Sequence, residues 1–189
     1  MRLPFIALVA LIPLAACDSG PSVTATNATQ KEVQEKVADA VGGGDAQMVE
    51  PGRWEGAMTV HEIDIPNMPA AAKEQMKQSM AGAKSFVSCV TPEDVKAQKA
   101  FFTGDEDDKS CKYDHFRLAG GKLDAALSCD RGEAGKMHMT MTGSYAPQSY
   151  RMDMASKAEG GPGHMGAMSM RMTVEAKRVG ACRGDEDKL

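Results

Sequence analysis

Met137-His138-Met139-Thr140-Met141-Thr142-Gly143-Ser144-Tyr145 decides the fold of this chain, because apolar and polar residues alternate along it. A period of two places the methionines on one face of a β-strand and the histidine and threonines on the other. Two later segments, Tyr150 to Met154 and Met168 to Glu175, repeat the pattern. Their polar reverse can face water, so the pattern predicts an antiparallel meander and not a parallel sheet covered on both faces.

The turn at residues 146–149 fixes the expected pairing of the first two strands. We expect the second strand to end at Ala155-Ser156, where the alternation fades. The expected registers are Tyr145 opposite Tyr150, Met141 opposite Met154, Lys157 opposite Ala167, and Met154 opposite Met170. These pairs predict one continuous apolar face across the three strands.

Strands and helices also alternate upstream of this meander. Trp54 to His61 and Ser85 to Val90 have the period of half-buried strands. Ala70 to Ala83 is rich in helix formers, and Thr91-Pro92 is a typical start for a helix reaching about Phe101. The predicted fold class is therefore mainly β (α+β): an antiparallel meander or partial barrel of about six strands, with two short helices packed on it.

The five cysteines divide into one near the N-terminus and an even set of four. A three-residue hairpin loop at Ala119-Gly120-Gly121 places Cys111 opposite Cys129, within disulfide distance. Cys89 is then left to pair with Cys182. A zinc site is disfavoured because no two of the four cysteines have C-x-x-C spacing.

The N-terminus has the layout of a secretory signal: Arg2, an apolar run from Leu3 to Leu14, and small residues before Cys17. Leu14-Ala15-Ala16-Cys17 resembles the bacterial lipobox, in which the cysteine is acylated on sulfur and becomes the first mature residue. More than one acyl chain anchors a protein stably. We therefore expect a protein held on a periplasm-facing membrane surface through Cys17. Asp18 resembles the signal for inner-membrane retention, although the outer membrane stays open.

The segment after the anchor is expected to join the membrane to the folded domain. Residues 18–27 are small and polar and predict a flexible tether. Thr29 and Glu32 form a capping box for a short amphipathic helix that ends at the glycines 42–44. The predicted division is a signal peptide at 1–16, a tether with this helix at 17–50, a β domain at 51–183 and a charged, solvated tail at 184–189.

Charge excludes one class of partner. The formal net charge of −4 makes nucleic acid an unsuitable ligand, since its phosphates demand a basic surface. The acidic run Asp105-Glu106-Asp107-Asp108 lacks the spacing of a calcium loop and is expected to be a solvated loop.

A set of motifs lies along the domain. These are Pro51-Gly52-Arg53-Trp54-Glu55, Ile65-Pro66-Asn67-Met68-Pro69, Cys89-Val90-Thr91-Pro92-Glu93-Asp94, Cys111, Cys129, Met139 to Gly143, and Arg178-Val179-Gly180-Ala181-Cys182. Together they resemble the domain-of-unknown-function family 3617, found in the envelope of Gram-negative bacteria. The resemblance covers nearly the whole domain and implies a secreted or lipid-anchored, mainly antiparallel β protein with disulfides. It carries no established activity or catalytic residues.

Fifteen methionines give the chain its main chemical signature. Thioether sulfur is a soft ligand that selects Cu(I), so periplasmic Cu(I) binding through methionine and histidine is one hypothesis. Met137 and His138 fall on opposite faces of a strand, which separates their side chains. His164 and Met165 beside a glycine-rich loop escape that objection and are the candidate metal ligands.

The leading hypothesis is a non-catalytic binding or structural protein with no cofactor. Nucleophile, phosphate and zinc-protease motifs are absent from the sequence. The histidines His61, His115, His138 and His164 lie on separate predicted elements without an obvious acid partner. A curled sheet with a flexible methionine lining suits an apolar small ligand such as an acyl chain. The alternative is that the same face is simply the core of the domain, closed by the two helices.

Overall fold

A computed structural model describes residues 21–42, 48–66, 68–80, 84–96, 109–160 and 167–188. The strands are β1 Val23–Thr29, β2 Gly52–Asp64, β3 Lys84–Val90, β4 Cys111–Ala119, β5 Lys122–Asp130, β6 Lys136–Ala146, β7 Ser149–Glu159, β8 Ala167–Gly180 and β9 Asp187–Lys188. The helices are α1 Gln30–Gly42, α2 Ala70–Met80, α3 Pro92–Lys96 and the single 3₁₀ turn Gly132–Ala134.

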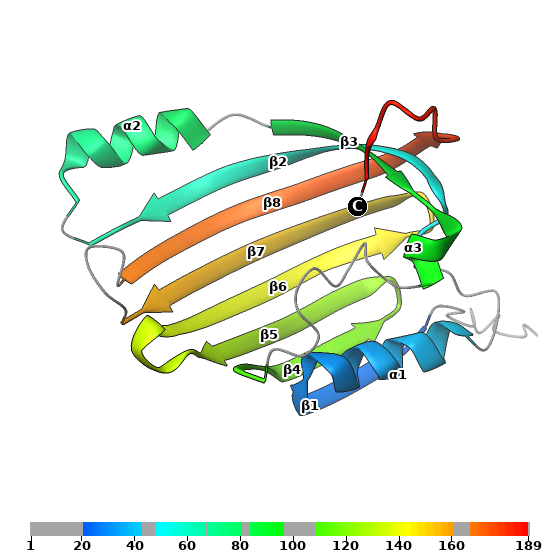
Figure 1. The fold of residues 1–189 in the computed structure, drawn as a ribbon, viewed down its shortest axis with the longest axis horizontal. Coiled ribbons are helices and arrows are strands. Elements are labelled where there is room, and N and C mark those ends of the chain that lie inside the picture. Colours follow the sequence, from blue (N-terminus) through cyan, green and yellow to red (C-terminus); the bar gives the residue numbers. More distant parts are fainter. Residues whose placement is uncertain are drawn as a thin grey trace, which may run out of the picture.

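All the described strands join one sheet in the order β1-β4-β5-β6-β7-β8-β2-β3-β9 (Figure 1). Every pair is antiparallel except β3 with β9. The mainly β class is therefore confirmed, and β4 to β8 form the expected meander. The described sheet is open, with β1 and β9 at its edges, and it has more strands than the six predicted.

The N-terminal segment corrects the expectation of a flexible tether. Residues 23–27 lie in β1, which pairs with β4 and buries Val23. α1 begins at the predicted capping box, where Thr29 and Glu32 exchange hydrogen bonds of 2.7–3.2 Å. It lies over β1 and β4 (Figure 1) and buries Val33 and Val37 completely. The tether expectation failed because small residues in β1 pack well against a neighbouring strand despite their polar composition.

The buried side chains form two clusters. The larger one lies between α1 and strands β1, β4 and β5, with Leu118 fully buried at its centre. The smaller one surrounds Trp54, whose side chain is 1% exposed. Tyr150 packs against both clusters and lies 5.7 Å from the Trp54 ring, so it links the two halves of the core.

The registers within the meander were only partly predicted. Tyr145 pairs with Tyr150 and Met141 with Met154, as expected. β7 does not end at Ala155-Ser156 but continues to Glu159, because it is hydrogen-bonded on both sides by β6 and β8. Its register with β8 is shifted by two residues from the expectation. An even shift keeps every side chain on its face. The observed partners are Met154 with Met172 and Lys157 with Ser169.

The β4–β5 hairpin brings Cys111 opposite Cys129 by a different route from the one predicted. Its loop has two residues, Gly120 and Gly121, whose φ angles of 60° and 67° suit a tight turn that other residues rarely form. A register shift between Tyr113 and His115 then moves the pairing by one residue and restores the expected cysteine pair.

The C-terminal segment corrects the expectation of a solvated tail at residues 184–189. Asp187–Lys188 pairs with β3, and the Glu186 side chain is 1% exposed. Arg53 on β2 holds it with a 2.8 Å ion pair. The described parts of the two predicted helices are Ala70–Met80 and Pro92–Lys96, while their expected continuations lie outside the described residues.

Candidate functional site

One face of the sheet carries nine of the methionines, and we call this surface the methionine face. It spans the adjacent strands β6, β7, β8 and β2, where the registers place the thioethers on the same side. Met152 is buried at 9% exposure, Met58 is exposed at 37%, and the others are intermediate. Its members are Met58, Met137, Met139, Met141, Met152, Met154, Met168, Met170 and Met172.

The opposite face is polar and charged. His138 and Thr140 are exposed there, while their neighbours Met137 and Met139 pack against the core cluster. The sequence argument that a strand separates His138 from these methionines is therefore confirmed. A metal ion cannot be shared by side chains that leave opposite faces of one strand.

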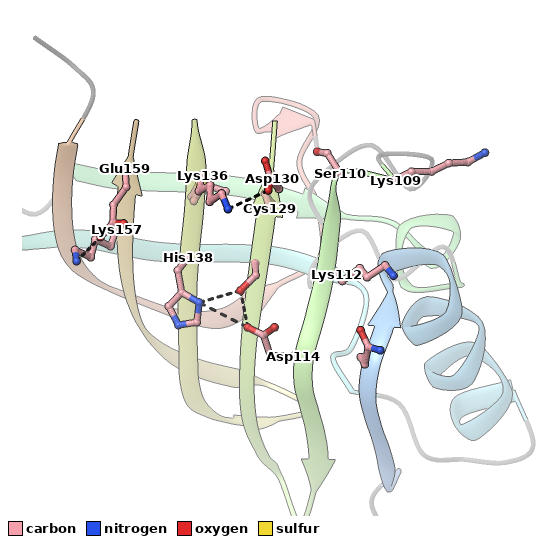
Figure 2. A pocket seen from close by; sticks show the side chains of 13 residues that line it. Lys109, Ser110, Lys112, Asp114, Cys129, Asp130, Lys136, His138, Lys157 and Glu159 are labelled. Atoms are coloured by element: carbon pink, nitrogen blue, oxygen red, sulfur yellow. Dashed lines mark hydrogen bonds and ion pairs between the residues drawn. The ribbon is translucent and has the colours of Figure 1, made fainter. Parts of the chain in front are cut away.

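A hollow of about 750 Å³ lies on this polar side, at one end of strands β4 to β7 (Figure 2). A smaller hollow of about 240 Å³ adjoins it and shares His138 and Lys157. Two backbone irregularities occur at the rim of the larger hollow. Asn27 on β1 has a φ of 51°, and Asp114 lies at the register shift of β4. Such irregularities redirect side chains and often adjoin functional sites.

Ser128, His138 and Asp114 form a hydrogen-bonded group in this hollow (Figure 2). The Ser128 hydroxyl donates to Asp114 Oδ2 at 2.6 Å, and its oxygen lies 3.1 Å from His138 Nδ1. The residue types are those of a hydrolase triad, but the connectivity differs. The single serine proton is directed to the carboxylate, so the imidazole does not accept it, as a catalytic base must.

Lysines and acids alternate around the same hollow. Lys136 lies 3.2 Å from Asp130, and Lys157 lies 2.5 Å from Glu159. The backbone N–H of Gly132 and then Lys136 lower the pKa of Asp130, and the hydrogen bond from Lys157 lowers that of Glu159. Lys109 and Lys112 add positive charge on the β4 side. The hollow thus offers charged groups of both signs, and the described residues that line it include no Phe, Tyr or Trp.

The three described histidines lie near acids, which the sequence did not reveal. His115 Nε2 is 3.2 Å from Asp124, and His138 Nδ1 is 3.6 Å from Asp114. His61 contacts Thr173 at 2.7 Å, and Thr173 in turn donates to Asp153 at 2.5 Å. This hydrogen bond lowers the pKa of Asp153. The expectation of histidines without acid partners is wrong for His115 and His138, because cross-strand partners depend on registers that the sequence does not specify. His61 contacts Asp153 only through Thr173.

The cysteines pair as expected. Disulfides join Cys89 to Cys182 and Cys111 to Cys129, at Cα separations of 5.5 and 4.0 Å. The other predicted positions lie outside the described residues: Cys17, Asp18, His164, Met165 and the acidic run 105–108. Within the residues that the structure describes, no group of three His, Cys, Asp or Glu side chains is placed to hold a metal ion. Nor does any helix in these ranges have the length and apolar character needed to cross a bilayer.

The fold and surfaces define a class of disulfide-bonded protein built on one open antiparallel sheet, with an apolar methionine face and a charged reverse. A family model described as "Protein of unknown function (DUF3617)" matches residues 49–182. The chain belongs to this family, in agreement with the resemblance seen in its motifs. Comparisons with curated proteins and with solved structures give no match.

Proposed function

We propose that this chain is a non-catalytic, lipid-anchored component of the bacterial cell envelope that holds an apolar ligand on its methionine face. The observation that carries the proposal is the partial exposure of contiguous thioethers on four strands. Adjoining apolar side chains that stay partly exposed can form a surface for an interaction partner. Methionine side chains are flexible and polarizable, which suits a ligand of variable shape such as an acyl chain.

The proposed location of the protein is a membrane surface, because the lipobox-like Leu14-Ala15-Ala16-Cys17 provides an anchor. Cys17→Ser should release the protein from the membrane fraction into the periplasm. Asp18→Ser should move it from the inner to the outer membrane if Asp18 acts as a retention signal. An outer-membrane location of the native protein would contradict this role of Asp18.

The non-catalytic part of the proposal is supported by the hydrogen bonds of the polar hollow. Ser128 donates to Asp114 and is therefore not activated by His138. Lys136 and Lys157 of this hollow are engaged in ion pairs with Asp130 and Glu159.

The apolar ligand is tested by native mass spectrometry of protein purified from its own membrane, together with binding of a fluorescent fatty acid. Met141→Lys places a charge in the middle of the methionine face and should weaken probe binding by about tenfold or more, since burying an unpaired charge is costly. Thr142→Lys is the matched control, because its neighbours on the polar face are Asp124 and Asp153. A clean apo mass, or equal probe binding by both variants, would refute the proposal.

A further inference from the structure

The methionine face contains one row in which three thioethers lie directly beside one another. Met141 on β6 pairs with Met154 on β7, and Met154 pairs with Met172 on β8. Directly opposed residues on the same face of an antiparallel sheet have Cβ atoms about 4.5–5.5 Å apart. Three flexible side chains at this spacing can turn their sulfur atoms toward a common point.

The rows on either side lack this arrangement. In the next row toward one end, Ser156 separates Met139 from Met170. In the row toward the other end, Met152 lies between Gly143 and Val174. The row of Met141, Met154 and Met172 is therefore the place on the described sheet where three consecutive strands each contribute a thioether.

We propose that Met141, Met154 and Met172 form a binding site for a soft monovalent metal ion, Cu(I) in the cell. Thioether sulfur prefers soft ions, and a set without nitrogen or carboxylate ligands favours Cu(I) over Cu(II) and Zn²⁺. Each of the three side chains is partly exposed in the described part of the chain, and Met141 also packs against the main core cluster. His138 takes no part, because its imidazole lies on the polar face.

The metal-site proposal is separate from the apolar-ligand proposal, although both concern the methionine face. Leucine retains the apolar character and approximate volume of methionine but has no sulfur. Met154→Leu should therefore remove the central metal ligand while it keeps an apolar side chain on the methionine face. The two proposals can consequently fail independently.

The experiment titrates the apo protein without oxygen with Cu(I) in competition with a chromophoric chelator, and with Ag(I) as an air-stable substitute. Nuclear magnetic resonance of ¹³C-labelled methionine methyl groups identifies the ligands. We expect one equivalent to bind and the methyl signals of Met141, Met154 and Met172 to shift together. Met154→Leu should weaken binding at least about tenfold, since disturbing even a neighbour of a ligand costs roughly that much.

Met152→Leu is the matched control, because Met152 lies two residues away on the same strand and face but outside the row. Circular dichroism checks that both variants are folded, and Met172→Leu replaces Met154→Leu if the latter is not. The proposal is overturned if the metal does not bind at micromolar concentration, if the three methyl signals do not move, or if Met152→Leu weakens binding as much as the row variant.

Discussion

Asn27 shows how one residue departs from the geometry of its strand. Its φ of 51° lies in the left-handed region, although β1 is otherwise extended. β-Branched residues reach this region only at a cost of about 1–2 kcal/mol, whereas glycine reaches it freely. Asn27→Val should lower the free energy of unfolding by that amount and Asn27→Gly should change it little, as measured by urea unfolding. Thr24→Val is the control at a regular position. Equal effects of the two valine variants would contradict the explanation.

Protonation of Glu186 should lower the stability of the fold at low pH. Burial raises its pKa, but hydrogen bonds from the Arg183 backbone, Arg53 and the Gly184 backbone outweigh burial and lower the pKa from 4.5 to about 2. A carboxyl group whose pKa is lower in the folded state than in the unfolded state stabilises the fold at pH values above its unfolded pKa. This stabilisation is lost as the pH falls through the folded-state pKa. Relative to Glu186→Gln, the native protein should lose stability between about pH 4.5 and pH 2. Acid unfolding measures the stability of both proteins as a function of pH, and an equal loss of stability in the two would refute this prediction.

At the scale of elements, the two disulfides constrain chain segments of very different length. Cys89 and Cys182 are separated by 93 residues, and Cys111 and Cys129 by 18. In the chain-entropy model the longer loop contributes about 1.5 kcal/mol more. The variant Cys111→Ala/Cys129→Ala keeps only the long-range bond, and Cys89→Ala/Cys182→Ala keeps only the short-range bond. Reduction should therefore lower the free energy of unfolding of the first variant by about 1.5 kcal/mol more than that of the second. Unfolding in oxidising and reducing buffers provides the comparison, and equal losses would argue against the entropic origin.

The elements also show how far the sequence predicts this fold and its surfaces. Alternation identified the methionine face because faces depend only on the period of two, which survives the two-residue error between β7 and β8. Registers were less predictable, because they depend on bulges such as the one between Tyr113 and His115. The polar hollow was missed for the same reason. Its central contact joins Ser128 to Asp114 across strands, and no local motif encodes that pairing.

At the scale of the whole molecule, the folded unit is larger than the family match at residues 49–182. β1 and α1 lie before it and bury Val23, Val33 and Val37 in the main core. Each fully buried valine contributes about 1.5–3 kcal/mol. A chain that starts at residue 49 should therefore be destabilised by roughly 3 kcal/mol or more relative to one that starts at residue 21. Thermal unfolding of the two chains measures the difference, and equal midpoints would show that β1 and α1 are dispensable.

The methionine face has a further consequence for a protein exposed to oxidants. A thioether that takes up one oxygen becomes a polar, chiral sulfoxide, and methionine sulfoxide reductases reverse the change. Because Met154 and Met172 are partly exposed while Met48 is only 5% exposed, limited hypochlorous acid should oxidise the face first, with the fold still intact. Peptide mass mapping would detect this order. The apolar methionine face would then become a polar, hydrated surface without any amino-acid substitution.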